Sequence, residues 1–232
     1  MKLLFFFTTF RQLEENKYQN QIFKQLNNLD FVNLSIDIIL HNNNKDFNQD
    51  IVTNSFDLNE FYKIKYINSV EVIHTNKNIG YLWGAQEAIS DNFKKFDNYD
   101  FVIHLNTDIY ILNLNYLIQY LYENLNTDYK FFVNKFRNTE YGFKTDLTIF
   151  KPSFNVYSNY NNDLMKSKLK PKKIPETLLK YAINANNLKY RILPNIFYPI
   201  KLNTYEENKI LNNNSIYHVH ELSYMNKILN IL

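Results

Sequence analysis

The chain of 232 residues contains no cysteine, so neither a disulfide framework nor a metal site built on thiolates is available to it. It also lacks a long hydrophobic run, since no segment approaches the roughly 18 consecutive apolar residues that a membrane-spanning helix requires. The segment Met1–Arg11 superficially resembles a secretory signal, but its apolar run is too short and no small-residue cleavage site follows. We therefore expect a soluble, cytoplasmic protein whose first apolar run is a buried strand.

A strong excess of basic charge is also missing. The net charge of +3 is too small for a nucleic-acid-binding domain, in which a clustered basic face is expected. Several lysines do gather between Lys166 and Lys173, and they form either a solvated loop or a lid that meets phosphates. Because apolar residues make up 45% of the chain and aromatic residues 17%, we expect a globular domain with a substantial core.

Glycine is scarce, and two of the three glycines, Gly80 and Gly84, lie four residues apart. Gly84 falls where a helix is expected to begin, and Gly within a helix costs roughly 0.5–1 kcal/mol relative to Ala. Its presence there indicates close approach of the backbone to a ligand or to a neighbouring element. The alternative is an ordinary strand–helix–strand crossover that binds no ligand.

The first half of the chain alternates short apolar runs with amphipathic stretches, a pattern typical of a parallel sheet with right-handed helical crossovers. Strands are expected at Lys2–Thr9, Leu34–Leu40, Val70–Ile73 and Phe101–Leu105. Helices are expected at Leu13–Leu29, Leu58–Tyr66 and Tyr81–Phe93. The sequence therefore predicts an α/β fold with a mostly parallel central sheet that helices flank.

The second half shows a less regular, mixed pattern. Strands are expected at Ile109–Ile111, Lys130–Val133, Phe143–Phe150, Tyr190–Leu193 and Ile196–Leu202, and around Tyr217–His220. Helices are expected at Asn115–Leu125 and Pro175–Asn186, the latter with Pro at a first helical position. Neither a repeat nor a linker is evident, so we expect a single domain over residues 1–232.

Polar residues follow four of the expected parallel strands. Ligands bind outside the carboxyl ends of the strands in an open parallel sheet, so these segments are expected to line one edge and form a site. Their amide, hydroxyl and cationic groups suit a nucleoside diphosphate, although single asparagines in so Asn-rich a chain can also be compositional chance. The segments are Thr8, Thr9, Phe10 and Arg11; His41, Asn42 and Asn43; Thr75, Asn76, Lys77 and Asn78; and Asn106, Thr107 and Asp108.

Asp108 is the sharpest single candidate. A carboxylate that closes a buried strand is either a helix cap or a ligand of a divalent cation, and the apolar residues Ile109–Ile111 argue against the cap. Asn106 offers a further oxygen. His218 and His220 alternate along an expected strand, so both face one side, and one imidazole could complete the shell of a Mn²⁺ ion. The alternative is a pair of partly buried, hydrogen-bonded histidines.

The segments Asn76–Ala88 and Tyr99–Ile111 together resemble the nucleotide-binding half of GT-A fold glycosyltransferases, the family-2-like group with a DxD-type metal motif. The chain is similar in size to small, single-domain viral enzymes of this fold. The resemblance implies that residues 1–112 form the nucleotide-binding half and residues 113–232 the acceptor-side half with the C-terminal tail.

The resemblance also implies roles for individual residues. The ends of the first two strands would hold the base and ribose, and the turn with Gly80 and Gly84 would lie beside the nucleotide. Asp108, with His218 or His220, would hold Mn²⁺ or Mg²⁺ on the diphosphate.

The sequence departs from the family pattern at two places. The first Asp of the metal motif is Asn106 here, and the Arg-Asn pair often found in the adjoining helix is replaced by Gln86-Glu87. In inverting members the catalytic base is an acidic residue at the start of a late helix, a place that Glu176 occupies, with Asp146 as a rival. A positioned base typically contributes about 10²–10⁴-fold to the rate.

Residues and resemblance together predict a metal-dependent glycosyltransferase that moves a sugar from a UDP-sugar to a hydroxyl of a glycan or glycoconjugate. Trp83 and Tyr110 are candidates to pack against the sugar or base. A nucleotidyltransferase is one alternative, although such enzymes normally carry a Gly-rich loop near the first strand and residues 1–30 contain no Gly. A catalytically inactive module that binds glycan or nucleotide is another, which Asn106 in place of Asp keeps open.

Overall fold

The computed structural model describes residues 1–9, 16–55, 57–75, 84–107, 109–111, 113–135, 143–153, 175–193 and 216–218. Its strands are β1 (Lys2–Thr9), β2 (Ser35–Asn42), β3 (Ile67–His74), β4 (Phe101–Asn106), β5 (Ile109–Ile111), β6 (Phe131–Lys135), β7 (Phe143–Phe150), β8 (Tyr190–Ile192) and β9 (Ile216–His218). Its α-helices are α1 (Asn16–Phe23), α2 (Gln49–Asn54), α3 (Leu58–Tyr62), α4 (Gly84–Asn92), α5 (Leu114–Asn124) and α7 (Pro175–Ala185). Two short 3₁₀ helices, η1 (Lys24–Asn28) and η2 (Phe93–Phe96), extend α1 and α4.

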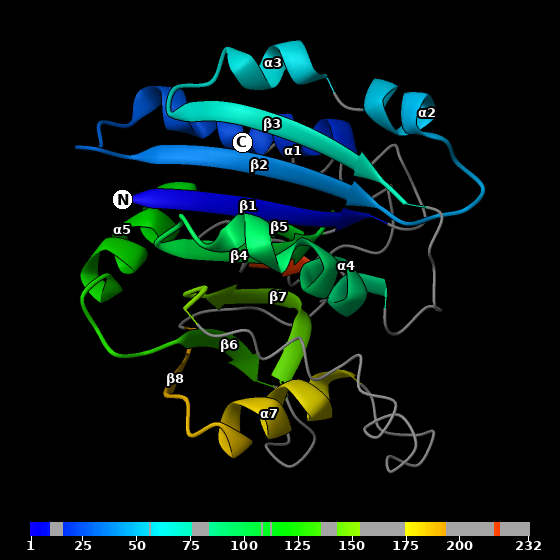
Figure 1. Ribbon diagram of the computed structural model, residues 1–232. Coiled ribbons are helices and arrows are strands. Elements are labelled where there is room, and N and C mark those ends of the chain that lie inside the picture. Colours follow the sequence, from blue (N-terminus) through cyan, green and yellow to red (C-terminus); the bar gives the residue numbers. More distant parts are fainter. Residues whose placement is uncertain are drawn as a thin grey trace, which may run out of the picture.

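Seven strands form one mixed sheet in the order β3-β2-β1-β4-β7-β6-β8 (Figure 1). The four amino-terminal strands pair in parallel, whereas β7 runs antiparallel to both β4 and β6. Strands β5 and β9 pair separately as a small antiparallel sheet. This arrangement is an α/β fold with a mostly parallel sheet, as the sequence predicts.

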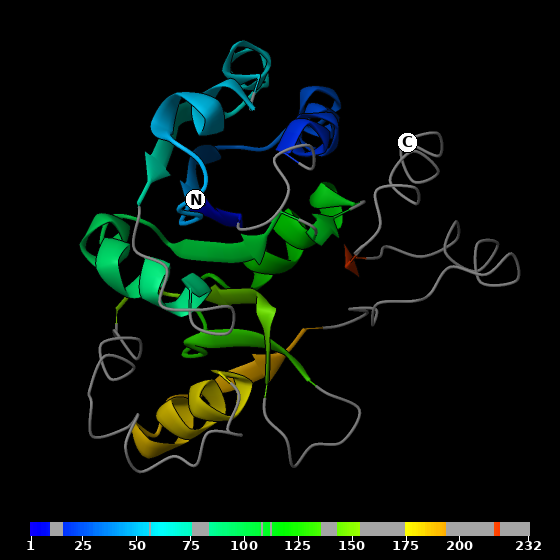
Figure 2. The same cartoon turned by 90° about the vertical axis from the view of Figure 1, so that its right-hand side faces the viewer.

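Strand β1 lies in the middle of the parallel strands and is buried on both faces. Leu3, Phe5 and Phe7 pack in a cluster with residues of α1 and α5, while Leu4 and Phe6 pack with residues of α4 and α7. The two groups of helices accordingly lie on opposite sides of the sheet (Figure 2). Each phenylalanine buried in this way contributes about 1.5–3 kcal/mol relative to an exposed one, so the apolar run fixes β1 at the centre.

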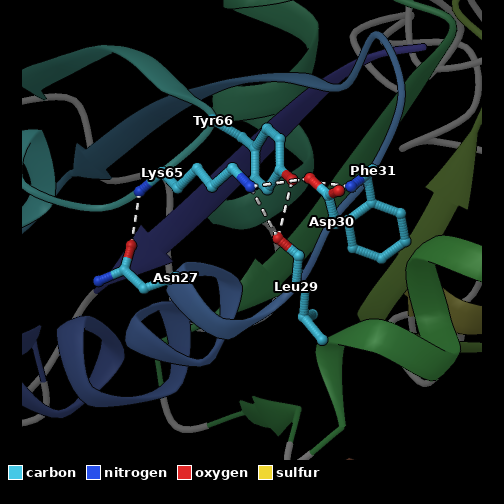
Figure 3. Close-up of polar contacts among 6 residues, drawn as sticks. All are labelled: Asn27, Leu29, Asp30, Phe31, Lys65 and Tyr66. Atoms are coloured by element: carbon cyan, nitrogen blue, oxygen red, sulfur yellow. Dashed lines mark hydrogen bonds and ion pairs between the residues drawn. The ribbon is translucent and has the colours of Figure 1, made fainter.

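A group of polar contacts fixes the amino-terminal edge of the sheet (Figure 3). Tyr66 adopts a φ of 75°, which is rare for a bulky residue. Its hydroxyl donates to the carbonyl oxygen of Leu29 at 2.9 Å and accepts from the backbone N–H of Phe31 at 2.7 Å. Lys65 Nζ donates to the same Leu29 carbonyl and to Asp30, each at 3.0 Å. These bonds, worth about 0.5–1.5 kcal/mol each, offset the backbone strain and anchor the segment that leads into β2.

Most of the expected elements are present, with differences at their ends. The bounds of β1 and β7 match the sequence-based prediction, whereas β2 extends to Asn42 and β3 begins at Ile67, because their ladder pairing continues into polar residues. Helix α2 was not expected; the side chain of Asn48 caps it by accepting from the N–H of Ile51 at 2.8 Å. The predicted strand Ile196–Leu202 lies outside the described residues.

The helix predicted over Leu58–Tyr66 is shorter, because α3 ends at Tyr62 and Tyr66 leaves the helical region. The described part of the helix predicted over Tyr81–Phe93 is α4, which ends at Asn92. Among the helices of the described ranges, none is long and apolar enough to cross a membrane.

Candidate functional site

The carboxyl ends of the four parallel strands meet at one edge of the sheet. Thr8 pairs with His41 of β2 on one side and with Asn106 of β4 on the other, and Asn42 pairs with His74 of β3. The chain keeps this order just beyond the strands, because the N–H of Thr75 donates to the carbonyl of Asn42 at 2.9 Å. The predicted convergence of these strand ends is thus confirmed.

Asn42 connects three of the strand ends and is fully buried. Its Nδ2 donates to the carbonyl oxygen of Thr9 at 3.2 Å. Its Oδ1 accepts from the N–H of Asn44 at 3.1 Å and lies 3.1 Å from Nδ1 of His74. In this structure the Asn42 side chain is therefore bonded to the protein, and it shapes the edge that a ligand would meet.

The hydroxyl of Thr8 connects β1 to β4. It donates to Oδ1 of Asn106 at 2.8 Å and lies 3.0 Å from Nε2 of His104, which is buried. The Thr8 hydroxyl thus holds Asn106 through its side-chain oxygen, the atom that the sequence analysis proposed as a further ligand of a cation.

Some buried side chains at this edge carry a polar atom without a hydrogen-bond partner in the described part of the chain. Thr9 and Gln86, each 3% exposed, are two of them, through Oγ1 and Oε1. Buried polar groups in folded proteins are nearly always paired, so each such atom calls for an explanation. Both lie on elements that end or begin at the carboxyl edge, β1 and α4.

Gly84 begins α4 in close contact with the end of β2. A Cβ on Gly84 would lie 2.5 Å from Nδ2 of Asn43, a distance that real Cβ contacts do not reach. The close approach expected from the sequence is therefore made to a neighbouring element. The glycine lets α4 pack onto the Asn43 side chain, which is 6% exposed.

Strand β9 brings the carboxyl-terminal tail to the segment that follows β4. Ile109 pairs with His218, Tyr110 with Tyr217, and Ile111 with Ile216. Since Ile109 directly follows Asp108 in sequence, the backbone of His218 lies beside the neighbour of that carboxylate. The sequence alone predicted both segments as strands but gave no sign that they pair.

Tyr110 does not take the role predicted for it. Its side chain is fully buried in the cluster that contains Ile22 and Leu117, so it packs in the core rather than against a ligand. The reason is the position of β5, which lies beside α1.

Gln19 is a residue that the sequence analysis did not identify. It is buried on α1, and its Nε2 donates to the carbonyls of Thr107 and Ile109 on either side of Asp108. In the sequence, the only sign of this role was a glutamine on the apolar face of an expected helix. Such a residue does not indicate which distant carbonyl groups its side chain will contact.

The two candidate bases lie on packed elements. Glu176 is in the first turn of α7, which packs against β7, the strand that contains Asp146. Leu147 of β7 pairs with Leu105 of β4, so the backbone of Asp146 lies at the same end of β4 as Asn106.

Several predicted site residues lie outside the described part of the chain, and their roles stay predictions. These residues are Phe10, Arg11, Asn76, Lys77, Asn78, Gly80, Trp83, Asp108 and His220. For Asp146, Glu176 and His218 the structure describes the backbone. Among the described residues, no group of three His, Asp or Glu side chains is placed to hold a metal ion.

Two histidines at this edge are buried and have a low affinity for protons. Burial, with the nearby charges of His74 and Lys95, lowers the pKa of His41 to about 4. Burial lowers the pKa of His104 to about 3, against a smaller opposing effect of a backbone hydrogen bond at Thr145. Both imidazoles are therefore neutral at pH 7, and the edge carries no histidine charge from them.

Comparison with known proteins gives a fold but no sequence family. No family model matches the chain, and no curated protein matches its sequence. The WbbM bifunctional glycosyltransferase has a TM-score of 0.59 and 13% identity, over 99% of this chain and 49% of WbbM. Mouse xyloside xylosyltransferase 1 has a TM-score of 0.50 and 10% identity, over 95% of this chain and 98% of that protein.

GlyE of Streptococcus pneumoniae TIGR4 matches 83% of this chain at a TM-score of 0.49 and 12% identity, over 45% of GlyE. The chain thus spans about half the length of WbbM and of GlyE. The likeness to WbbM and to the xylosyltransferase confirms the GT-A type of α/β fold that the sequence predicts.

We expect Gly84→Ala to be destabilising in the native chain and stabilising once Asn43 is truncated. In an unhindered helix the exchange gains up to about 1 kcal/mol, but here the new methyl group must displace the Asn43 amide. Urea unfolding of Gly84→Ala, Asn43→Ala and the double variant measures the coupling, which we expect at about 0.5–3 kcal/mol. If the effects of the two single substitutions simply add in the double variant, the Asn43 side chain moves away from the new methyl group at no energetic cost, and the prediction is wrong.

The free energy of unfolding should fall as the pH is lowered from 6.5 toward 4. The folded-state pKa values of His41 and His104 lie below the usual 6.5, so the unfolded chain binds the extra protons in this window. Between its folded and unfolded pKa values, each histidine lowers the free energy of unfolding by about 1.4 kcal/mol for each unit that the pH falls. Above pH 6.5 both histidines are neutral in the folded and in the unfolded chain, so this loss is absent. Urea unfolding between pH 7 and 5 measures the slope, which His41→Gln should reduce. A free energy of unfolding that stays constant over this range would contradict the assignment.

Proposed function

We propose that the chain is a metal-dependent glycosyltransferase that transfers a sugar from a nucleoside diphosphate sugar, UDP-linked, to a hydroxyl group of a glycan or glycoconjugate. The observation that carries this proposal is the pairing of β9 with β5. The backbone of His218 pairs with that of Ile109, the residue that follows Asp108 in sequence. This pairing supports the proposal that two metal-binding residue types, from segments about a hundred positions apart in the chain, serve one site.

The carboxyl edge supports the nucleotide part of this proposal. Ligands of open α/β sheets bind outside the carboxyl ends of the strands, where Thr9, Asn42 and Asn106 lie. Hydrogen bonds from a bound base, ribose or phosphate would also explain the buried atoms of Thr9 and Gln86 that have no partner within the described ranges. The solved structures with the same fold include proteins named as glycosyltransferases.

The donor set fits a divalent cation of the Mn²⁺ or Mg²⁺ kind. A carboxylate from Asp108, an imidazole from His218 or His220 and an oxygen from Asn106 are ligand types that Mn²⁺ accepts. When bound, such an ion acts as a Lewis acid that neutralises the charge of the departing diphosphate. The chain's own part is to hold Asn106 in place, which the Thr8 hydroxyl does at 2.8 Å.

The acceptor hydroxyl must lose a proton during transfer, and we propose Asp146 or Glu176 as the base. The position of Asp146 on β7, at the end of the β4 ladder where Asn106 lies, favours it. Glu176 remains the alternative base, because its helix α7 packs on the same strand. A catalytically inactive binding module is the second candidate function, because Asn106 replaces a carboxylate and is already bonded to Thr8.

We expect Asp108→Ala to lower hydrolysis of UDP-sugar by about 10²-fold or more, because the cation loses its charged ligand. Binding of UDP measured by calorimetry should weaken in the presence of Mn²⁺ and stay unchanged in EDTA. The matched control is Asp97→Ala, which removes an exposed carboxylate before β4, at the opposite end of that strand.

Three outcomes separate the candidates. Full activity of Asp108→Ala would overturn the metal assignment. Mn²⁺-dependent UDP binding without hydrolysis or transfer by the unchanged chain would favour the binding module. Formation of a nucleoside diphosphate sugar from a sugar phosphate and UTP would identify a nucleotidyltransferase instead.

A further inference from the structure

The side-chain amide of Gln19 donates both of its N–H hydrogens to backbone carbonyls of one short segment. Its Nε2 donates to the carbonyl oxygen of Thr107 at 2.8 Å and to that of Ile109 at 3.0 Å. The residue is 1% exposed, so water does not compete for these bonds. Helix α1 packs beside β5, which brings the amide to the carbonyls from outside the sheet.

The two carbonyls belong to the place where the chain leaves the main sheet. Strand β4 ends at Asn106, and β5, which begins at Ile109, pairs with β9 instead. The N–H of Thr107 donates to the carbonyl of Thr8 at 3.2 Å, so Thr107 is held from both the strand side and the helix side. Bonds to other elements therefore hold the backbone carbonyls of Thr107 and Ile109, the residues before and after Asp108.

We propose that Gln19 is a positioning residue that presets the Asp108 segment for the cation and the diphosphate, an inference that rests on the proposed function. A carboxylate whose two neighbouring residues are already held in place loses less freedom when it binds an ion, so the ion binds more tightly. Groups that orient metal ligands from outside the coordination shell typically change metal affinity about 10–100-fold when they are removed.

Both bonds require a side chain with two N–H donors, which the Gln19 amide provides. An ionised carboxylate has no donor, and an apolar side chain of equal length would remove both bonds. Asn20, the next residue on α1, provides a comparison. It is 4% exposed, and its Nδ2 donates to the carbonyl of Asp57 at 3.1 Å, at the N-cap of α3 rather than near Asp108.

The test compares Gln19→Met with Asn20→Leu in the full chain. Each substitution keeps the approximate size of the side chain and removes buried amide-to-carbonyl bonding from the same helix. Calorimetric titration of UDP at a series of Mn²⁺ concentrations, and again in EDTA, measures the ion requirement, and thermal unfolding measures stability. We expect Gln19→Met to raise the Mn²⁺ concentration for half-maximal UDP binding about 10–100-fold, with binding in EDTA unchanged. Asn20→Leu should leave the Mn²⁺ requirement unchanged.

A lowered melting temperature with the native Mn²⁺ requirement in Gln19→Met would overturn the proposal and leave Gln19 as a structural residue. An equal rise in both variants would do the same, because the effect would follow from lost stability. If Gln19→Met does not fold, Gln19→Asn replaces it in the test, because its side chain keeps the amide but is too short to reach the two carbonyls. We expect Gln19→Asn to raise the required Mn²⁺ concentration by the same factor. Failure of the unchanged chain to bind UDP with Mn²⁺ would instead overturn the proposed function.

Discussion

Strand β1 pairs in parallel with β2 on one side and with β4 on the other, and this pairing sets the position of every residue at the carboxyl edge. The pairing persists because β1 is apolar on both faces, with Phe5 and Phe7 packed on one side and Phe6 on the other. A shift by one residue would exchange the two faces and move Thr8 away from both His41 and Asn106. The packing of the core therefore determines the geometry of the candidate site.

Buried polar side chains then convert the strand ends into a fixed edge. Asn42 bonds to Thr9 and Asn44, Thr8 bonds to Asn106, and Gln19 bonds to the carbonyls on both sides of Asp108. Hydrogen bonds in such a water-poor environment are costly to break, because each released group would stay unpaired. A preset site of this kind is what electrostatic stabilisation of a leaving diphosphate requires.

The sequence was informative where one element carries its own signal. The continuous apolar run of β1 and the strand of β7 were predicted with their observed bounds, and the polar strand ends were correctly expected at one edge. Contacts between distant segments were not predictable. The pairing of Ile109 with His218 has no local pattern, and the contact that requires Gly84 lies on Asn43, in a chain where asparagine is too common to stand out.

A crystal structure of the chain with UDP and Mn²⁺ tests the central claim most directly, since that claim places the nucleotide at the carboxyl edge of β1, β2 and β4. We expect the uracil and ribose beside the ends of β1 and β2, and the ion between the diphosphate, Asp108 and a histidine of the tail. Thr9 or Gln86 should then have a ligand partner for its buried polar atom. A nucleotide bound at any other surface, or an ion held without Asp108, would contradict the account.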